Sequence, residues 1–414
     1  MRVALIAEVF LPKVDGVVHR TLNLIDQLRR RGDELLVICP QAPGCNAGPV
    51  PVKAFPSFSF PFYPEYRIGL PNRALIADLS SFAPDVVHFI NPFAFGFRCH
   101  DLLTDAGVRF PTVFSFHTLY GEFVKRYRVL RPLSGLLWWL TRTYHNRADV
   151  NLTVSTVMCH ELRERGFERV ELWPPAVDTA LFHPGRRDPG MRARLSDGRP
   201  DQPLMLTVSR LAPEKNVAFL AEVLDAVPEA RLAIVGDGPQ RAELERRFQD
   251  RPACFLGYLR GEELAAAYAS ADVFVYASET ETMGNVVLEA MASGCAVVAP
   301  RAGGIPSLLT DGESGFLYRP GDVTEAARLV RQALGDAALR RRVGEKARQM
   351  VEQRSWGPSI NRVRQIYAET IAAPRPAMPA DWNQQAARLA VRGLVATFRA
   401  VAAGQRVPPV GQRS

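Results

Sequence analysis

The sequence lacks the signatures of several large protein classes. Its six cysteines never stand in CxxC spacing, which argues against zinc or thioredoxin-like sites and fits a reducing cytosol. No apolar run approaches the ~20 residues that a membrane span needs. The N-terminal apolar run meets Glu8 too early for a secretory signal. We therefore expect a cytoplasmic protein, with peripheral attachment to the inner face of the cell membrane left open.

Nucleotide-cofactor and nucleic-acid signatures are absent as well. Without a GxGxxG fingerprint or a P-loop, a nicotinamide or ATP site has no support, and without a helix-turn-helix, zinc-finger or RNP pattern we expect no nucleic acid partner. No DxD stands at a strand end, so we expect neither a metal nor a cofactor. The net charge of +8 is compatible with phosphate-bearing substrates and with anionic membranes, and it does not distinguish between them.

Short apolar runs alternate with helical patterns along both halves of the chain. Unbroken apolar strands between helices indicate parallel sheets covered on both faces. The sequence therefore predicts an α/β fold of two Rossmann-like parallel-sheet domains facing a cleft, with ligands at the carboxyl ends of the strands. The predicted strands are 2–7, 34–39, 85–89, 112–116 and 149–154 in the first half, and 203–210, 231–238, 272–278 and 295–300 in the second.

Breaker-rich segments divide the chain further. We expect an N-terminal domain over 1–175, a Pro- and Gly-rich linker over 176–202 and a second domain over 203–356. A helix over 357–373 returns towards the N-terminal domain in this scheme. A Pro-rich break and an amphipathic basic tail helix make up 374–414.

The stretch SETETMGNVVLEAMASG places Glu281 and Glu289 eight positions apart, with a helix beginning near Gly284. A rise of ~1.5 Å per helical residue puts the carboxylates roughly 10 Å apart or more. That is wide for a pair flanking one scissile bond, so they suit the two ends of an elongated ligand, a sugar and a ribose. The backbone N–H groups of Gly284, Asn285 and Val286 suit a diphosphate between them. The alternative is that the Glu residues have no ligand and only stabilise the positive end of the helix dipole.

Three further loops follow predicted strands. VSRLAPEKN carries Arg210 and Lys215, two cations suited to a leaving diphosphate, or simply two solvated surface charges. FLPKVDGVVHR carries Asp15 and Gly16 before a helix, and Gly16 allows the backbone to approach a phosphate. FSFHTLYGEF carries His117 at a strand end. His117 either faces the cleft and binds the sugar or acceptor, or has a structural role only.

Two segments are candidates for contact with an anionic membrane. Segment 125–147 has six Lys or Arg, no acid, and Trp138 beside Trp139. In 383–406, apolar residues recur at helical spacing beside a stripe of arginines. A buried helix with basic flanks is the alternative for the first segment, and a helix packed back onto a domain for the second.

The motifs in their order resemble the family 4 retaining glycosyltransferases, which have the GT-B architecture, over roughly residues 1–370. The resemblance is strongest to enzymes that glycosylate membrane lipids, such as sulfoquinovosyl-diacylglycerol synthases and bacterial GDP-mannose-dependent α-mannosyltransferases. The motifs that carry it are FLPKVDGVVHR, SFHT, VDTALFHP, SRLAPEKN, VGDGPQRAELE, the E-x7-E pair and LEAMASGCAVVAPRAGGIP. Met283 stands where Phe or Leu is usual, and Ala176 replaces the glycine of a GVD turn.

The resemblance implies a role for each matching position. It makes the first domain the acceptor domain and the second the nucleotide-sugar domain. Glu281 binds sugar hydroxyls, Glu289 binds the ribose, Arg210 and Lys215 hold the diphosphate, Gly16 approaches it from the other domain, and His117 contacts the transferring sugar. We expect transfer of a hexose, with retention and without a metal, from a GDP- or UDP-sugar to a hydroxyl of a membrane glycerolipid or glycolipid. The alternatives are a soluble GT-B enzyme acting on a sugar or small metabolite, and a non-catalytic nucleotide-sugar binding protein.

Overall fold

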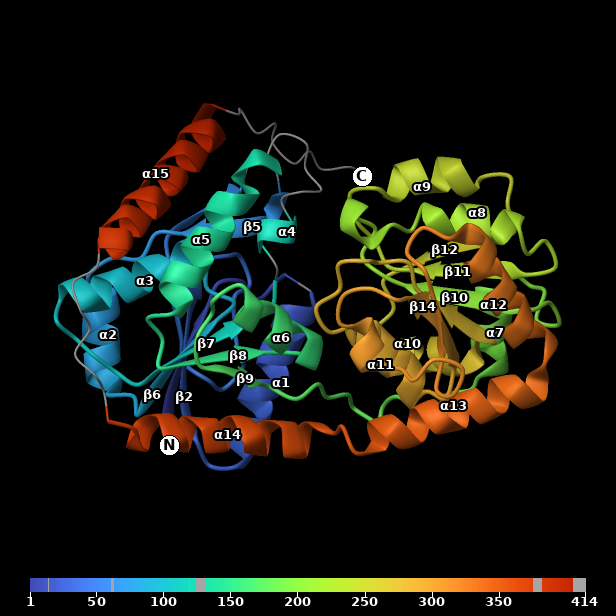
Figure 1. Ribbon diagram of the computed structural model, residues 1–414, viewed down its shortest axis with the longest axis horizontal. Coiled ribbons are helices and arrows are strands. Elements are labelled where there is room, and N and C mark those ends of the chain that lie inside the picture. The colour runs from blue at the N-terminus through green and yellow to red at the C-terminus, as the bar shows by residue number, and fades with distance from the viewer. Residues whose placement is uncertain (14, 61–62, 119, 124–130, 375–381, 405–414) are drawn as a thin grey trace.

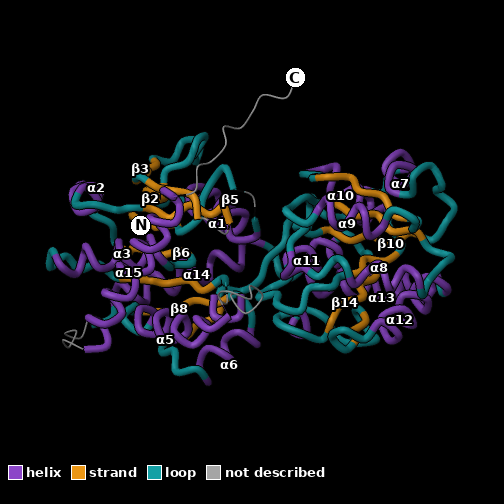
Figure 2. The backbone as a smooth tube through the Cα atoms, turned by 90° about the horizontal axis from the view of Figure 1, so that it is seen from above, coloured by secondary structure: helices purple, strands orange, loops and turns teal. Residues whose placement is uncertain are grey.

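Two lobes, each built on a parallel sheet, lie side by side in the computed structural model of the chain (Figures 1 and 2). This arrangement confirms the predicted α/β fold of two parallel-sheet domains. The structure describes residues 1–13, 15–60, 63–118, 120–123, 131–374 and 382–404.

The first lobe contains a seven-stranded sheet in the order β3-β2-β1-β6-β7-β8-β9, all parallel. Its central strands are buried on both faces because helices cover both sides, as their unbroken apolar runs require. The strands are β1 (Arg2–Ala7), β2 (Glu34–Pro40), β3 (Val52–Phe55), β6 (Val86–Ile90), β7 (Thr112–Phe116), β8 (Val150–Thr153) and β9 (Val170–Leu172), with a separate antiparallel pair β4 (Ser57–Phe60) and β5 (Tyr63–Gly69). The helices are α1 (Gly16–Arg30), α2 (Ala74–Phe82), α3 (Ala94–Asp105), α4 (Tyr120–Phe123), α5 (Ser134–His145) and α6 (Thr156–Glu164).

The second lobe contains a six-stranded parallel sheet in the order β12-β11-β10-β13-β14-β15. Its strands are β10 (Leu204–Val208), β11 (Arg231–Val235), β12 (Ala253–Gly257), β13 (Val273–Val275), β14 (Ala296–Pro300) and β15 (Phe316–Tyr318). Its helices are α8 (Phe219–Asp225), α9 (Arg241–Phe248), α10 (Gly261–Ser270), α11 (Asn285–Ala292), α12 (Val323–Gly335) and α13 (Ala337–Glu352). Helix α8 begins only at Phe219, because a 3-10 turn over Pro213–Lys215 ends with Asn216 at a left-handed φ of 49°.

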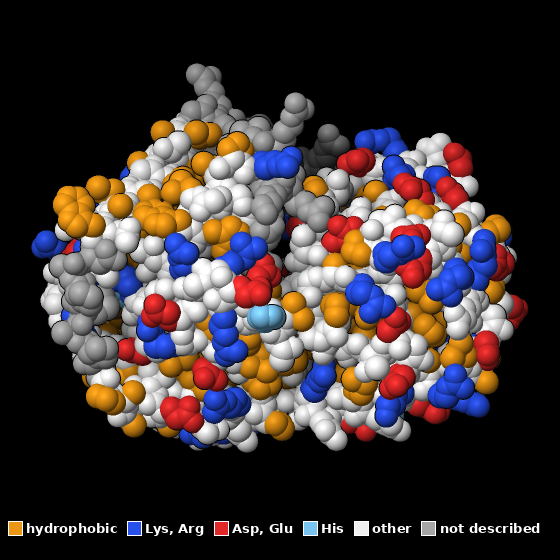
Figure 3. Space-filling model, in the orientation of Figure 1, with side chains coloured by type: hydrophobic (Ala, Val, Ile, Leu, Met, Phe, Trp, Pro, Cys, Tyr) orange, Lys and Arg blue, Asp and Glu red, His pale blue; other side chains and the backbone are white. Residues whose placement is uncertain are grey.

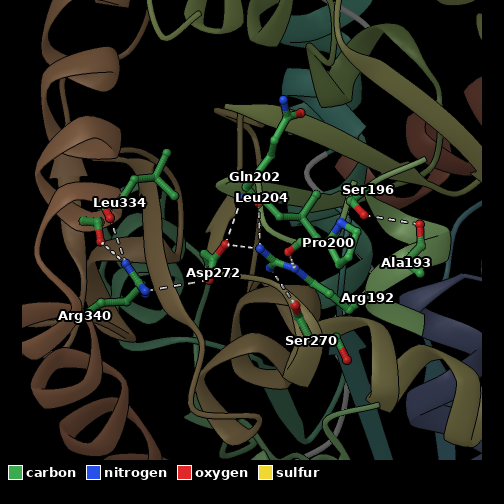
Figure 4. A network of polar contacts seen from close by, with 11 residues as sticks. Arg192, Ala193, Ser196, Pro200, Gln202, Leu204, Ser270, Asp272, Leu334 and Arg340 are labelled. Carbon is green, nitrogen blue, oxygen red and sulfur yellow. Dashed lines mark hydrogen bonds and ion pairs between the residues drawn. The ribbon is translucent and has the colours of Figure 1, made fainter. Parts of the chain in front are cut away.

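Much of segment 176–202 packs into the second lobe. Its helix α7 (Pro189–Leu195) contributes Met191 and Leu195 to that core. The guanidinium of Arg192 binds Asp272, which also meets the guanidinium of Arg340 on α13 at 3.7 Å (Figure 4). This half-buried network fixes the chain that enters the second sheet to the start of β13.

The chain then returns to the first lobe. Helix α14 (Trp356–Ala372) runs on from α13 along one edge of both lobes (Figure 1) and buries Ile360, Val363 and Ile366 against the first sheet. The hydroxyl of Tyr367 hydrogen-bonds Nδ1 of His88 at 2.6 Å. The two lobes are thus joined twice, at 173–178 and at 352–356.

The tail helix α15 (Trp382–Gly404) packs on the first lobe against α3, α5 and β4. Its apolar face, with Ala387, Val391 and Val395, is buried there. The guanidinium of Arg388 lies 3.1 Å from the buried carboxylate of Asp101. The packed-helix alternative for this segment is therefore confirmed, and lipid contact through that face is wrong because the protein already covers it.

Candidate functional site

Lys215, Tyr276 and Glu281 meet where the carboxyl ends of β10 and β13 converge. The ammonium of Lys215 lies 2.7 Å from Oε2 of Glu281, and the hydroxyl of Tyr276 donates to the same oxygen at 2.5 Å. Lys215 Nζ also lies 3.5 Å from the Tyr276 hydroxyl. Two residues predicted from separate loops therefore form one cluster, and Tyr276 completes it.

The contacts within this cluster favour the ionised forms of both Glu281 and Lys215. Burial alone raises the pKa of Glu281, but the Lys215 ammonium, the Tyr276 hydroxyl and the backbone N–H of Gly284 together lower it below the usual range. Burial lowers the pKa of Lys215, and the Glu281 carboxylate and Tyr276 more than offset this, so the pKa is raised. Lys215 retains N–H donors beyond those directed at its two partners.

Helix α11 begins directly after this cluster. Gly284 precedes it with φ at 85°, and a Cβ there would lie 2.7 Å from Cδ1 of Ile305, so both conformation and space require glycine. In the described part of the chain no side chain caps α11, which leaves the N–H groups of Asn285 and Val286 as donors for an anion.

Glu289 lies one turn inside α11 and has a different environment. The hydroxyl of Tyr268 on α10 donates to its Oε2 at 2.9 Å. Burial raises the pKa of Glu289 to about 7, although this hydrogen bond lowers it. The two carboxylates thus have separate partners, Lys215 and Tyr276 for Glu281 and Tyr268 for Glu289.

His117 follows β7 in the first lobe and is buried. Its Nε2 lies 2.9 Å from the Ser115 hydroxyl, and its backbone N–H donates to Oδ1 of Asn91. Burial first, and then the nearby Arg20, lower its pKa well below the usual value, so the ring is neutral. The hydroxyl of Thr282 donates to the His117 carbonyl oxygen at 3.0 Å, which brings His117 against the loop that carries Glu281.

Asp15 and Gly16 open α1 on the same side of the first lobe. Asp15 accepts from the N–H groups of Val17 and Val18 and pairs with Lys13 at 2.7 Å, so its carboxylate caps the helix. A Cβ on Gly16 would lie 2.8 Å from Nδ2 of Asn285 in the other lobe. Gly16 and the start of α11 therefore face each other across the domain interface.

Arg210 lies apart from this cluster. Its Nη2 meets Oε2 of Glu65 on β5 at 3.2 Å, an ion pair that crosses between the lobes. Burial lowers the pKa of Arg210, and Glu214 among other groups raises it. The two cations predicted on one loop thus have different partners, Glu65 for Arg210 and Glu281 for Lys215.

Arg20 lies beside the candidate site, and we did not single it out from the sequence. Its guanidinium is buried over the Trp173 ring at 4.1 Å and donates to the thioether of Met283 at 3.0 Å. Met283, in the loop between Glu281 and Gly284, is therefore buried and contacts the opposite lobe. Arg20 lies four residues after Gly16, so helical spacing was the one signal that pointed to it.

Tyr268 and Tyr276 were also missed. Tyr276 directly follows the carboxyl end of β13, where ligand-binding residues are expected in such sheets. Tyr268 lies within α10, a position that does not suggest a ligand-binding role. Across the described ranges, no three His, Cys, Asp or Glu side chains are grouped as metal ligands would be. No helix among the described residues has the length and apolar content to cross a membrane.

Comparison with protein families gives two matches that together span most of the chain. Residues 14–181 match the family Glycosyltransferase Family 4, and residues 195–350 match Glycosyl transferases group 1.

Three curated relatives are informative. Sulfoquinovosyl transferase SQD2 of Arabidopsis thaliana is 37% identical, over 85% of this chain and 70% of that protein. A GDP-mannose-dependent alpha-mannosyltransferase of Mycolicibacterium smegmatis is 41% identical, over 86% of this chain and 94% of that protein. An alpha-monoglucosyldiacylglycerol synthase of Acholeplasma laidlawii is 24% identical, over 77% of this chain and 85% of that protein.

Solved structures share the two-domain fold. A sucrose-phosphate synthase from Thermosynechococcus elongatus superposes with a TM-score of 0.72 at 21% identity, over 90% of this chain and 100% of that one. Anabaena Alr3699/HepE in complex with UDP-glucose superposes with a TM-score of 0.69 at 21% identity, over 90% of this chain and 99% of that one. With a relative 41% identical over nearly its whole length, and this fold and site, the chain belongs to the family 4 glycosyltransferases of GT-B fold and is a hexosyltransferase.

Proposed function

We propose that the protein transfers a hexose, with retention and without a metal, from a nucleoside-diphosphate sugar to a hydroxyl of a membrane glycerolipid or glycolipid. The observation that carries the proposal is the Lys215–Tyr276–Glu281 cluster at the open N-terminus of α11. Lipid acceptors are supported by relatives named for sulfoquinovosyl transfer and for monoglucosyldiacylglycerol synthesis.

The donor binds along α11 and the loop before it. Glu281, ionised at neutral pH, accepts hydrogen bonds from hydroxyls of the sugar, and Glu289 accepts from the ribose. The diphosphate lies between them on the N–H groups of Asn285 and Val286. The third N–H of the Lys215 ammonium is directed at the diphosphate, where it stabilises the charge that develops as the glycosidic bond breaks.

The first lobe completes the site. Gly16 allows the backbone of α1 to approach the diphosphate, and Asp15 fixes the start of that helix. Arg210 exchanges its partner Glu65 for the diphosphate when the donor binds, since a bidentate phosphate contact is stronger than an exposed ion pair. His117, held neutral by burial, donates a hydrogen bond to the transferring sugar.

The chemical step proceeds by attack of the acceptor hydroxyl on the face that the diphosphate leaves. The sugar passes through an oxocarbenium-like state, and the departing phosphate oxygen takes the proton of the acceptor hydroxyl. Closure of the two lobes excludes water, so the activated sugar goes to the acceptor hydroxyl.

A membrane acceptor requires the enzyme to reach a lipid surface, and α15 with α5 offers one. Trp138 stacks on Phe116 and Trp139 packs on the core, so these two rings are engaged within the protein. Trp382, at 86% exposure, and Leu389, at 68%, lie on the outer face of α15 instead.

Figure 3 shows hydrophobic side chains gathered over the part of the first lobe where Figure 1 places α15 and α5. Residues 382–404 contain no acid, and the exposed Arg399 suits anionic headgroups, whereas Arg388 and Arg392 pair with Asp101 and Asp105 on α3. We propose that this outer face rests on an anionic bilayer at the cytoplasmic side of the membrane. Residues 125–130 of the predicted contact segment 125–147 lie outside the described residues.

The test of the transfer proposal has two stages. Thermal unfolding is measured with a panel of GDP- and UDP-sugars, where a ligand at 100 times its Kd adds roughly 2.7 kcal/mol to the unfolding free energy. Turnover is then measured with the stabilising donor and anionic vesicles that contain diacylglycerol or glycosylated diacylglycerol. Glu281→Ala should abolish transfer and keep the fold, whereas the exposed Glu313→Gln serves as the matched control.

Each alternative predicts a different result. Stabilisation by a donor without turnover on any acceptor indicates a nucleotide-sugar binding protein. Turnover on soluble sugars alone, with no flotation on anionic vesicles, indicates a soluble GT-B enzyme. Loss of flotation in Leu389→Glu, with donor stabilisation unchanged, supports the surface on α15.

A further inference from the structure

A cavity of about 290 Å³ lies at the junction of the two lobes, apart from the residues assigned to the donor. Its walls come from the first lobe, from the loop at Ser307 in the second, and from the segment that joins α13 to α14. Its lining comprises Ser155, Thr156, Leu172, Pro174, Pro175, Ser307, Gln353, Arg354, Ser355, Pro358 and Ser359. These described lining residues include no Asp or Glu.

Arg354 is the one charged residue among those lining residues. Its Nη1 is buried and has no hydrogen-bond partner among the described residues. Burial is the cause of its lowered pKa, with no carboxylate acting on it in the described structure. The Arg354 side chain is half-buried, and an N–H group of a guanidinium that is removed from water without an acceptor is costly, so the buried Nη1 favours a bound anion.

A second buried cation stands behind the cavity wall. Arg20 donates to the carbonyl oxygens of Trp173 and Pro174, and Pro174 lines the cavity. Burial alone lowers the pKa of Arg20 to about 9, and no described residue is a carboxylate partner for it. Within the described chain, Nε of Arg20 and the indole N–H groups of Trp173 and Trp356 are also buried without acceptors. The surroundings of the cavity therefore contain an excess of donors.

Two helix N-termini add to this positive character. Ser155 and Thr156 belong to the start of α6, and Ser355, Pro358 and Ser359 to the start of α14. In the described structure Ser355 makes no side-chain cap to the 17-residue α14. The Ser155 hydroxyl caps α6 by accepting from the N–H of Met158, and the Ser359 hydroxyl donates to the carbonyl oxygen of Pro174. The positive ends of both helix dipoles thus line the same space as Arg354.

We propose that this hinge cavity is a binding site for a small oxyanion of the phosphate class, held by Arg354 and the N-termini of α6 and α14. The proposal does not depend on which sugar or acceptor the enzyme uses. The bound phosphate contacts both lobes through the cavity walls. It therefore favours the closed arrangement and increases affinity for the donor.

A link to the donor site runs through the loop of Ser307. The N–H of Gly304 donates to the backbone carbonyl of Glu281 at 2.7 Å, and a Cβ on Gly303 would lie 2.3 Å from the same oxygen. The loop that closes one wall of the cavity is thus packed on the backbone of the sugar-binding residue. Binding in the cavity and binding of the donor should therefore be coupled, and the coupling must be reciprocal.

The test is calorimetric titration of the full chain with inorganic phosphate at constant ionic strength, with chloride as the reference salt. Wild type should bind one phosphate, Arg354→Gln should bind about tenfold more weakly or not at all, and Arg354→Lys should recover part of the affinity. Thr156→Trp, at an exposed lining position, should fill the cavity and block binding while the fold is kept. Arg341→Gln, an exposed arginine on α13, is the matched control.

A second titration separates this cavity from the diphosphate site. Arg210→Gln should keep phosphate binding, because Arg210 does not line the cavity and is proposed to bind the donor diphosphate. Equal binding by Arg354→Gln and wild type, or loss in Arg210→Gln alone, would overturn the proposal, since phosphate would then occupy the donor site.

The source of the phosphate is found by repeating the titration with a soluble short-chain phosphatidic acid. Tighter Arg354-dependent binding of this compound assigns the site to a lipid headgroup, whereas tighter binding of inorganic phosphate assigns it to a free anion. Phosphate should also lower the Kd of the donor severalfold, and an unchanged donor Kd would refute the coupling. A protein that binds phosphate here but fails to transfer any sugar would refute the proposed function and leave this site intact.

Discussion

The ion pair between Lys215 and Glu281 offers the sharpest test of how the donor site is built. The two groups lie 2.7 Å apart with side chains 24% and 17% exposed, so they are partly screened by solvent. At an effective dielectric constant of ~20 their attraction is roughly 6 kcal/mol, of which desolvation cancels a large part. Lys215→Gln leaves the carboxylate of Glu281 with Tyr276 and no cation, and should cost about 2 to 3 kcal/mol of unfolding free energy.

A double-mutant cycle isolates the pair. In Lys215→Gln combined with Glu281→Gln no buried charge remains, so the double variant should be more stable than Lys215→Gln, with a coupling energy of about 1.5 kcal/mol or more. The measurement is urea-induced unfolding of the four proteins, with thermal midpoints as a second probe. A Lys215→Gln variant within about 0.5 kcal/mol of wild type, with additive effects, would refute this account of the cluster.

The same pair predicts a pH window. The folded pKa of Glu281 lies below its unfolded value of 4.5, so its contribution is present above pH 4.5 and is lost as pH falls through the folded pKa. The folded pKa of Lys215 lies above 10.5, so its contribution is present below pH 10.5 and is lost as pH rises through the folded pKa. The stability difference between wild type and the double variant should therefore be flat from about pH 5.5 to 9.5.

Two further substitutions test the domain interface and the tail. Gly16→Val places side-chain atoms where Nδ2 of Asn285 lies 2.8 Å from the Cβ position, so it should raise the KM for the donor about tenfold and leave the thermal midpoint nearly unchanged; an unchanged KM would show that α1 does not approach the donor. Arg388→Leu leaves the buried carboxylate of Asp101 without its tail partner and should cost about 1 to 3 kcal/mol, measured by urea unfolding, and a loss below about 0.5 kcal/mol would mean that α15 is held by its apolar face alone.

The sequence predicted the interior of each sheet and missed its edges. Strands β1 and β7 occupy the predicted residues, and each other predicted strand is found with shifts at its ends, because strands buried on both faces read as apolar runs. The strands β3, β9, β12 and β15 were not predicted, and these are the four edge strands of the two sheets. Short strands with one neighbour need fewer apolar residues, so no run distinguishes them.

In the candidate site, likewise, residues close together in the sequence were predicted and their partners from distant elements were not. Glu281, Gly284 and Glu289 were found because one loop and one helix carry them. Tyr268 supports Glu289 from α10, and Arg20 reaches Met283 from the other lobe. Such partners depend on how the elements pack, which no local pattern records.

The contrast between Glu281 and Glu289 leads to a prediction about the donor. Lys215 keeps Glu281 ionised, whereas Glu289 has Tyr268 and a pKa of about 7, raised by burial. A ribose hydroxyl donates to a carboxylate, and protonation weakens that hydrogen bond because it removes the negative charge of the acceptor. Affinity for the donor should therefore rise with pH through about 7 and level off above it.

The measurement is the donor Kd across that range for wild type, Glu289→Gln and Tyr268→Phe. Glu289→Gln should give weak binding that does not vary with pH. Tyr268→Phe removes a hydrogen bond that lowers the pKa of Glu289, so its transition should move to higher pH. A wild-type profile that is flat through pH 7, or a transition that persists in Glu289→Gln, would mean that another group controls donor binding, and the assignment of Glu289 to the ribose would be wrong.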